Sequence, residues 1–203
     1  MFTTGRTYLV TKRIFDFVVS AVLLFLLLPV CLLIAVAIYL DTGLPILLAA
    51  ERTGRDGKRF RMLKFRTMVA NAEELKAELA HLNVLPAPDF KIPNDPRITR
   101  VGRFLRRTSL DELPQLLNVL AGDMALVGPR PTSFAPSTYR LWHTYRLEVT
   151  PGITGLWQVR GRNQTTFDER LRLDIDYIDH RSFGLDLKIL LQTIPTIFRR
   201  SGL

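Results

Sequence analysis

Residues Phe17–Leu40 read FVVSAVLLFLLLPVCLLIAVAIYL, without one charged side chain. As an α-helix this run would be about 36 Å long, enough to cross a bilayer core of about 30 Å. A core helix of a soluble protein is rarely so long and so uniformly apolar. The run also exceeds the apolar part of a secretory signal, about 7–15 residues. The stretch therefore predicts a helix inserted in a membrane.

Two features of this run argue against a simple crossing of the bilayer. Pro29 lies near its middle, and a proline inside a helix removes a hydrogen bond and kinks or breaks the helix. Basic residues, which favour the cytoplasmic side, lie on both flanks. They are Arg6, Lys12 and Arg13 before the run and Arg52, Arg55, Lys58, Arg59, Arg61, Lys64 and Arg66 after it. A re-entrant helix that turns near Pro29 satisfies both flanks; the alternative is an ordinary kinked span.

The chain as a whole is basic. Its 203 residues include 28 Lys and Arg against 19 Asp and Glu, a net charge of +9. Such an excess indicates an anionic partner: a membrane surface, a phosphorylated substrate or nucleic acid. Little aromatic interleaving accompanies the basic residues, so we expect no nucleic acid partner. Cys31 is the single cysteine, and the histidines lack the spacing of a zinc site.

The rest of the chain predicts a mainly helical α/β domain. Ile46–Ala50 and Phe60–Met68 read as two extended runs around a turn at Thr53–Lys58, and Gly155–Gly161 is also expected to be extended. Apolar spacing predicts helices over Ala72–Leu82, Val101–Arg107, Leu113–Leu120, Thr138–Val149, Phe167–Asp179 and Leu185–Arg199. The last of these has an apolar face that suits either a core or a membrane interface.

Two adjacent acids, Asp111 and Glu112, stand at the start of an apolar helix. One interpretation is structural: Asp111 caps the helix, with Pro114 in the first turn. Alternatively, Ser109 and Glu112 form a capping box. The other interpretation is catalytic, and the residues alone leave both open.

Several cationic side chains are expected on rigid segments of the backbone. Lys64 and Arg66 would share one face of a strand, Arg130 lies in the Gly-Pro-Arg-Pro loop that begins at Gly128, and Arg162 follows a glycine. A guanidinium group binds two phosphate oxygens at once, and lysine adds a point charge. The GxxxxGK[ST] and GxGxxG nucleotide loops are absent. These cations favour a diphosphate site of another kind, although each alone is equally consistent with a solvated surface charge.

A set of motifs, in order along nearly the whole chain, resembles the bacterial sugar transferases, which are monotopic polyprenyl phosphate phosphoglycosyl transferases. The motifs are KRIFD (Lys12–Asp16), KFRTM (Lys64–Met68), NDPRIT (Asn94–Thr99), SLDELPQ (Ser109–Gln115), VGPRP (Val127–Pro131), PGITG (Pro151–Gly155) and GRN (Gly161–Asn163). Several long motifs in the same order are highly specific.

The resemblance implies an architecture. It is a small membrane-bound α/β catalytic domain with an N-terminal Pro-broken re-entrant helix and amphipathic interfacial helices, at the cytoplasmic face of the bacterial inner membrane. Residues 1–44 would hold the membrane hairpin and residues 45–203 the catalytic domain. Larger relatives carry further segments, so this chain resembles the minimal catalytic form. Leu28 replaces a serine that is frequent before Pro29 in the family, so the sharpness of the bend stays open.

The resemblance also implies a reaction. Asp111 would attack the β-phosphate of a UDP-sugar, UMP would leave, and polyprenyl (undecaprenyl) phosphate would take the sugar phosphate from the aspartate. Mg²⁺ close to Asp111 would neutralise the phosphoryl charge. Glu112 would orient or assist, or accept a proton.

Four basic residues match positions of the family motifs: Lys64, Arg106, Arg130 and Arg162. They would bind the substrate phosphates by charge-assisted hydrogen bonds. The non-catalytic alternative is a membrane-anchored basic binding or scaffold module. The sugar, the glycan, the carrier length and the oligomeric state stay open.

Overall fold

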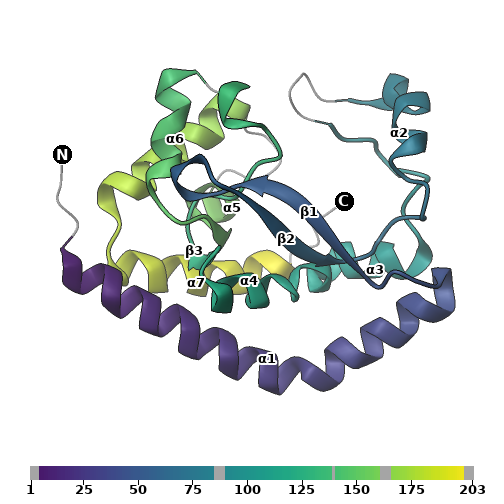
Figure 1. Ribbon diagram of the computed structural model, residues 1–203, viewed down its shortest axis with the longest axis horizontal. Helices are drawn as coiled ribbons and strands as arrows, with labels where there is room; N and C mark the ends of the chain where they lie inside the picture. Colours follow the sequence, from purple (N-terminus) through teal and green to yellow (C-terminus); the bar gives the residue numbers. More distant parts are fainter. Residues whose placement is uncertain (1–4, 85–89, 139, 161–165, 199–203) are drawn as a thin grey trace.

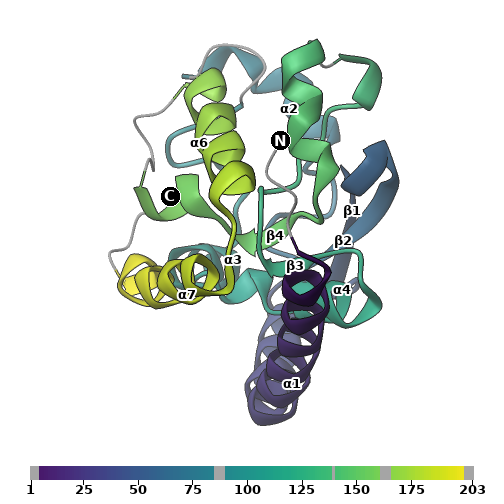
Figure 2. The same ribbon diagram turned by 90° about the vertical axis from the view of Figure 1, so that its left-hand side faces the viewer.

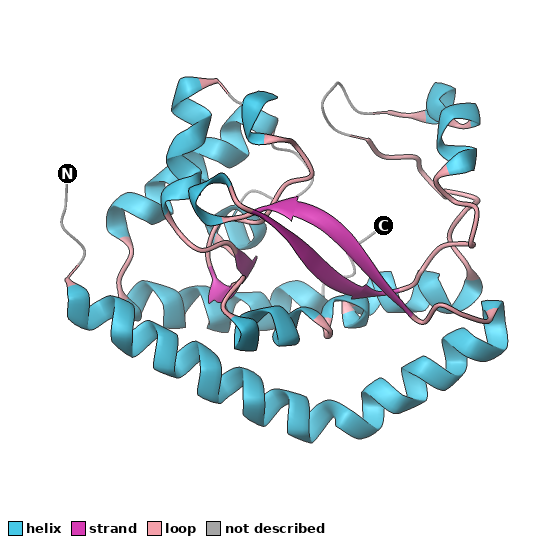
Figure 3. Cartoon of the chain, viewed as in Figure 1, coloured by secondary structure: helices cyan, strands magenta, loops and turns pink. Residues whose placement is uncertain are grey.

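The computed structural model describes residues 5–84, 90–138, 140–160 and 166–198. This part of the chain is mainly helical, with two small sheets (Figures 1 and 3). The helices are α1 (Arg6–Thr42), α2 (Glu74–Glu78), α3 (Arg100–Thr108), α4 (Gln115–Ala121), α5 (Leu156–Arg160), α6 (Phe167–His180) and α7 (Phe183–Phe198). The strands are β1 (Leu47–Thr53), β2 (Arg59–Phe65), β3 (Ala125–Val127) and β4 (Gly152–Thr154). The 3₁₀ turns are η1 (Arg55–Gly57), η2 (Ala80–Leu82), η3 (Leu110–Glu112), η4 (Pro136–Thr138) and η5 (Leu141–Glu148).

The long apolar N-terminal helix is confirmed. α1 has 37 residues and a stretch with a mean hydropathy of 3.2, of which 11% is buried, so by length and composition it is able to cross a membrane. Large apolar side chains such as Phe25 and Leu33 are 79% and 71% exposed. So wide an apolar surface marks a contact with lipid or protein.

α1 continues as a helix through Pro29. Figure 1 shows it bowed, with both arms rising toward the rest of the molecule, and Figure 2 shows it projecting below the other elements. The re-entrant course and a break at Pro29 stay predictions.

Arginines fasten both arms of α1 to the rest of the protein. Arg13 donates to the carbonyls of Val119 and Leu120, at 2.6 and 2.9 Å, at the end of α4. Arg66, just after β2, donates to Thr42 Oγ1 and the Gly43 carbonyl at the end of α1, both at 2.5 Å. The end of α1 and the strand that carries Lys64 are therefore joined directly.

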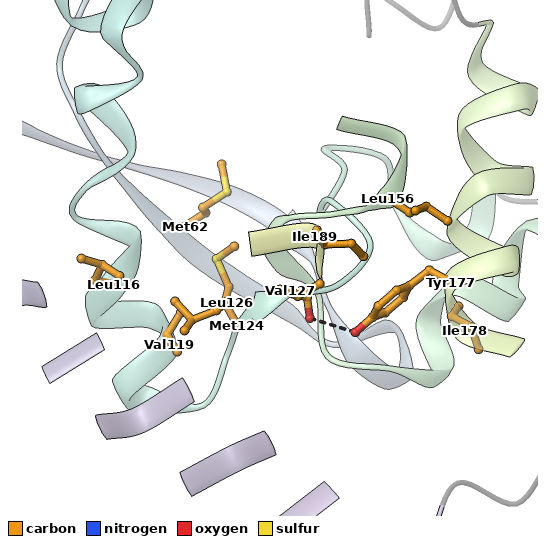
Figure 4. Packing of buried hydrophobic residues seen from close by; sticks show 10 residues of the cluster. All are labelled: Met62, Leu116, Val119, Met124, Leu126, Val127, Leu156, Tyr177, Ile178 and Ile189. Carbon is orange, nitrogen blue, oxygen red and sulfur yellow. Dashed lines mark hydrogen bonds between the residues drawn. The ribbon is translucent and has the colours of Figure 1, made fainter. Parts of the chain in front are cut away.

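The two sheets lie above α1 in Figure 1, and strands of both contribute residues to the main core. β1 and β2 form the expected antiparallel hairpin, with Leu47 opposite Phe65 and Thr53 opposite Arg59. β3 pairs with β4 in parallel. The core residues come from β2, α4, β3, α5, α6 and α7, and Tyr177 adds a 3.2 Å hydrogen bond to the Val127 carbonyl (Figure 4).

Most of the predicted helices are confirmed, and three segments differ. Ala72–Leu82 is not one helix, because α2 ends at Glu78 and the 3₁₀ segment η2 follows. Gly155–Gly161 is not extended: its described part is α5, because Leu156 and Val159, three apart, pack against the core as one helical face. Most of Thr138–Val149 forms the 3₁₀ turn η5. Residues three apart are aligned in that conformation, and it turns both His143 and Arg146 inward, where they are buried.

Candidate active site

The acid pair lies in η3, between α3 and α4. Ser109 adopts a left-handed conformation with φ of 57° and turns the chain sharply at the end of α3. α4 begins three residues after Glu112, with Pro114 as its N-cap, and η3 and α4 lack a side-chain cap. Both capping interpretations are therefore wrong. The two carboxylates are directed to other partners.

Glu112 is held by two cations. Lys64 Nζ donates to Oε1 at 2.9 Å. Arg130 donates to both oxygens, with Nη1 at 3.2 Å from Oε2 and Nη2 on Oε1. Burial alone would raise the pKa of this carboxyl, but the charges of Arg130 and Lys64 outweigh burial and hold the pKa of Glu112 well below its usual range. Glu112 is thus a fixed anion.

Asp111 has a different environment. Its side chain is buried, and among the described residues Lys64 is the one cation within 4 Å, with Nζ 3.8 Å from Oδ2. Burial raises the pKa of Asp111, Lys64 lowers it, and the neighbouring charge of Glu112 raises it further. The net shift is upward. Asp111 is the member of the pair with carboxylate oxygens available to a ligand.

The backbone of Arg130 is held by a buried ion pair. Arg146 Nη2 donates to the Arg130 carbonyl at 2.5 Å and pairs with Asp174 at 2.7 Å. Arg146 and Asp174 are 6% and 1% exposed, so a buried ion pair fixes the loop that presents the guanidinium. Sequence reasoning missed this pair, since an arginine and an aspartate in two amphipathic helices look like surface residues.

The other predicted phosphate ligands are placed differently. Arg106 Nε donates to Thr67 Oγ1 at 2.9 Å. Burial lowers the pKa of Arg106, and the charge of Asp111 raises it, so the guanidinium lies within the field of Asp111 without a direct ion pair. Arg66 is on the strand face predicted with Lys64, but its guanidinium donates a hydrogen bond to Thr42 at the end of α1. Arg162 lies outside the described residues.

A cavity of about 260 Å³ lies next to the two cations that hold Glu112, although neither acid lines it. Lys64 and Arg130, which bind Glu112, both line it. Its other cations are Arg52, Arg146 and Arg170, and its aromatic side chains are Phe134, Trp157 and Phe167. The sequence did not predict these six residues, because they come from five separate segments that only folding brings together.

The donor atoms at the site fit a magnesium ion only together with a ligand. The described residues contain no cluster of three or more His, Cys, Asp or Glu side chains able to hold a metal. Mg²⁺ commonly takes one or two carboxylates and completes its shell with water and substrate phosphates. Asp111 supplies such a carboxylate, whereas the oxygens of Glu112 are taken by Lys64 and Arg130.

Comparison with known proteins gives a consistent result. The family model described as "Bacterial sugar transferase" matches residues 7–200. The chain is 46% identical over 196 residues to the undecaprenyl-phosphate galactose phosphotransferase of Salmonella typhimurium, covering 94% of this chain and 41% of that protein.

Two further relatives are similar. The UDP-glucose:undecaprenyl-phosphate glucose-1-phosphate transferase of Caulobacter vibrioides is 43% identical over 195 residues, covering 92% of this chain and 69% of that protein. The exopolysaccharide production protein ExoY of Rhizobium meliloti is 38% identical over 196 residues, covering 94% and 87%. The chain spans less than half the length of the Salmonella relative and most of the ExoY protein.

Proposed function

The chain belongs to the bacterial sugar transferase family, and from this premise we propose that it transfers a sugar 1-phosphate from a UDP-sugar to undecaprenyl phosphate or a similar polyprenyl phosphate. The products are a polyprenyl diphosphate-sugar and UMP. Relatives are named for galactose and for glucose transfer to this carrier and for exopolysaccharide production. We assign the reaction to the first membrane step of a bacterial glycan.

The observation that carries the proposal is the contrast between the two acids. Glu112 is immobilised by Lys64 and Arg130, and Asp111 beside it keeps its oxygens available. An available carboxylate amid cations is suited to attack a phosphorus atom, because the cations neutralise the charge that would repel it. We therefore assign Asp111 as the nucleophile.

The first step forms an acyl phosphate. An Asp111 oxygen bonds to the β-phosphorus of the UDP-sugar, the bond from that phosphorus to the bridging oxygen breaks, and UMP leaves with the electron pair. Lys64 and Arg130 bind the oxygens of the diphosphate, for which an ammonium and a guanidinium are matched donors. Bound Mg²⁺, held by Asp111, would supply further neutralisation of phosphate charge.

We assign Glu112 an orienting role and not that of a proton acceptor. A carboxylate whose pKa is held far below its usual range is a weak base. The phosphate of the lipid carrier is already ionised at neutral pH and attacks without a strong base. Glu112 instead fixes Lys64 and Arg130 on the side of the acid pair where the phosphates bind.

The second step requires the carrier to reach Asp111 from the membrane. The exposed apolar surface of α1 and its attachment to β2 through Arg66 support a site held next to the bilayer. With basic residues on both flanks of the apolar run, we place the protein at the cytoplasmic face of the inner membrane. The carrier phosphate then attacks the phosphorus and releases Asp111.

Intact-protein mass spectrometry tests the proposal. Detergent-solubilised protein is mixed with Mg²⁺ and a panel of UDP-sugars, without lipid carrier. The expected result is a mass gain equal to one sugar phosphate, absent in Asp111→Asn and present in the matched control Asp56→Asn at the exposed hairpin tip. UMP formed only after polyprenyl phosphate is added would replace the covalent step by direct transfer. No gain and no UMP with any donor would overturn the proposed reaction.

A further inference from the structure

The cavity beside the acid pair has two chemically different walls. The β1–β2 hairpin contributes Arg52 and Lys64, and Lys64 also binds Glu112. The facing wall comes from α5 and α6 and contributes Trp157, Phe167 and Arg170. A site for phosphate alone needs the first wall and has no use for the second. A ligand that contacts both walls would carry phosphate groups and also a planar or apolar group.

The aromatic side chains of this wall already contact one another and Arg170. The Arg170 guanidinium carbon lies 5.5 Å from the centre of the Trp157 ring and 5.8 Å from that of Phe167. Phe134 meets Phe167 edge to face, with centres 5.5 Å apart and an angle of 86° between the rings. Interlocked rings and a guanidinium plane form a rigid platform. Such platforms bind bases of nucleotides by stacking, with little cost in side-chain entropy.

The polar groups of the cavity favour a ligand that accepts hydrogen bonds. Four arginines and a lysine line it. Asp174 is the one carboxylate among the lining residues; it is 1% exposed and pairs with Arg146. Uracil has two ring carbonyls that accept from such donors. A cytosine brings an amino donor in place of one carbonyl acceptor, and among the lining side chains only Asp174, Thr132 and Ser133 could accept from it.

We propose that Trp157, Phe167 and Arg170 form a uracil-binding site, on which the nucleoside end of the donor stacks while Lys64 and Arg130 hold its diphosphate. This inference rests on the proposed function, which makes the donor a nucleotide sugar. The cavity volume of about 260 Å³ is just below the ~300–1,000 Å³ of most small-molecule sites. A cavity of this size suits one part of the donor, the nucleoside. The sugar phosphate would extend past Lys64, whose Nζ lies 3.8 Å from Asp111 Oδ2.

Tryptophan fluorescence tests the site without any turnover. The chain has two tryptophans, and Trp142→Phe leaves Trp157 as the single reporter. We expect UDP with Mg²⁺ to quench Trp157 saturably, CDP to bind about tenfold more weakly, and inorganic pyrophosphate to compete with UDP without quenching. Quenching by a hexose 1-phosphate and none by UDP would assign the aromatic wall to the sugar and overturn the proposal.

Substitutions test the contributions of the two walls to binding separately. Trp157→Leu and Arg170→Gln should each weaken UDP about tenfold, within the range measured for loss of one stacking partner, and leave pyrophosphate affinity unchanged. Trp142→Leu is the matched control, because Trp142 does not line the cavity. UDP affinity equal to that of the parent in both variants would place the base elsewhere. Should Trp157→Leu fail to fold, Arg170→Gln and the fluorescence titration decide.

The two proposals fail in different ways. Uracil-dependent quenching with neither a sugar-phosphate mass gain nor UMP release, with or without polyprenyl phosphate, would keep the nucleoside site and remove the transferase reaction. A mass gain at Asp111 with Trp157 unaffected by UDP would keep the reaction and remove the nucleoside site.

Discussion

Asn118 Oδ1 accepts a 2.9 Å hydrogen bond from the backbone N–H of Leu63, so a side chain of α4 binds the open edge of β2. The same amide donates to the Arg61 carbonyl at 2.8 Å. The two hydrogen bonds lie on either side of Met62 and pair with the β2 backbone in the way that a neighbouring strand would. β2 carries Lys64, and α4 directly follows the acid pair. Asn118 thus fixes the position of Lys64 relative to Asp111 and Glu112.

Replacing Asn118 with leucine should lower the free energy of unfolding by about 1–3 kcal/mol, because a buried N–H and a carbonyl lose their partner. The midpoint of thermal or urea unfolding, measured in detergent, checks this. Asn71→Leu is the matched control, since Asn71 is exposed in the turn before α2. A loss no larger than in the control would show that water replaces the amide at this edge.

The two acids should have opposite effects on stability. The pKa of Glu112 is lowered in the folded protein, so its ionised form stabilises the fold at neutral pH. Glu112→Gln should cost about 1.5–3 kcal/mol at pH 7. The pKa of Asp111 is raised, so its ionised form opposes folding there. Asp111→Asn should match or exceed the stability of the parent.

The pH dependence of these differences follows from the same shifts. The Glu112 contribution is complete above its ordinary pKa of 4.5 and disappears as the pH falls below it. The Asp111 penalty disappears below its ordinary value of 3.8. Unfolding midpoints of both variants and the parent between pH 3.5 and pH 8 measure this. Equal losses in both variants at pH 7 would contradict the different roles assigned to the two carboxylates.

Lys64 should control the pH at which Asp111 becomes reactive. Its charge is the largest influence that lowers the pKa of Asp111, so Lys64→Met should raise that pKa further. The rate of sugar-phosphate attachment, which requires ionised Asp111, would then begin to rise only at higher pH. Single-turnover rates across pH, with the exposed Lys58→Met as control, measure the shift. An unchanged acidic limb with a lower plateau would restrict Lys64 to substrate binding.

Local sequence signals were sufficient for some parts of the site and not for others. The motifs around Lys64, Asp111 and Arg130 identified groups that the structure brings together, because each motif keeps its cation or acid on a short, stiff segment. The hydrogen bond from Arg106 Nε to Thr67 Oγ1 had no local signal, since it depends on how α3 packs against the segment after β2. The assignment of Arg106 to phosphate stays a prediction.

The supporting residues had no local signal. Asn118 and Arg146 act on backbone groups 55 and 16 residues away in the chain, and such pairs are set by tertiary packing. The same holds for the aromatic wall of the cavity, which unites α5, α6 and the loop after Arg130. Periodicity located α3, α4, α6 and α7 because it depends only on neighbours in the sequence, but it missed α5.

Removal of magnesium should abolish the reaction and leave the fold intact. The described residues hold no cluster of three metal-ligating side chains, so the ion is expected to bind at Asp111 together with the donor diphosphate. Excess EDTA should therefore eliminate the sugar-phosphate mass gain without moving the unfolding midpoint, and added Mg²⁺ should restore the gain. A midpoint lowered by EDTA would indicate a structural ion instead.

The course of α1 in the membrane is tested by labelling from one side. Arg13 and Arg66 tie the two arms of α1 to the same body of the protein, and a straight crossing would pull one of these contacts through the bilayer. Gly5→Cys and Arg55→Cys, each in a Cys31→Ser background, should both react with an impermeant thiol reagent only when the cytoplasmic face is exposed. Labelling of the two positions from opposite sides would establish a single span, and the contacts of Arg13 or Arg66 would then have to break in the membrane.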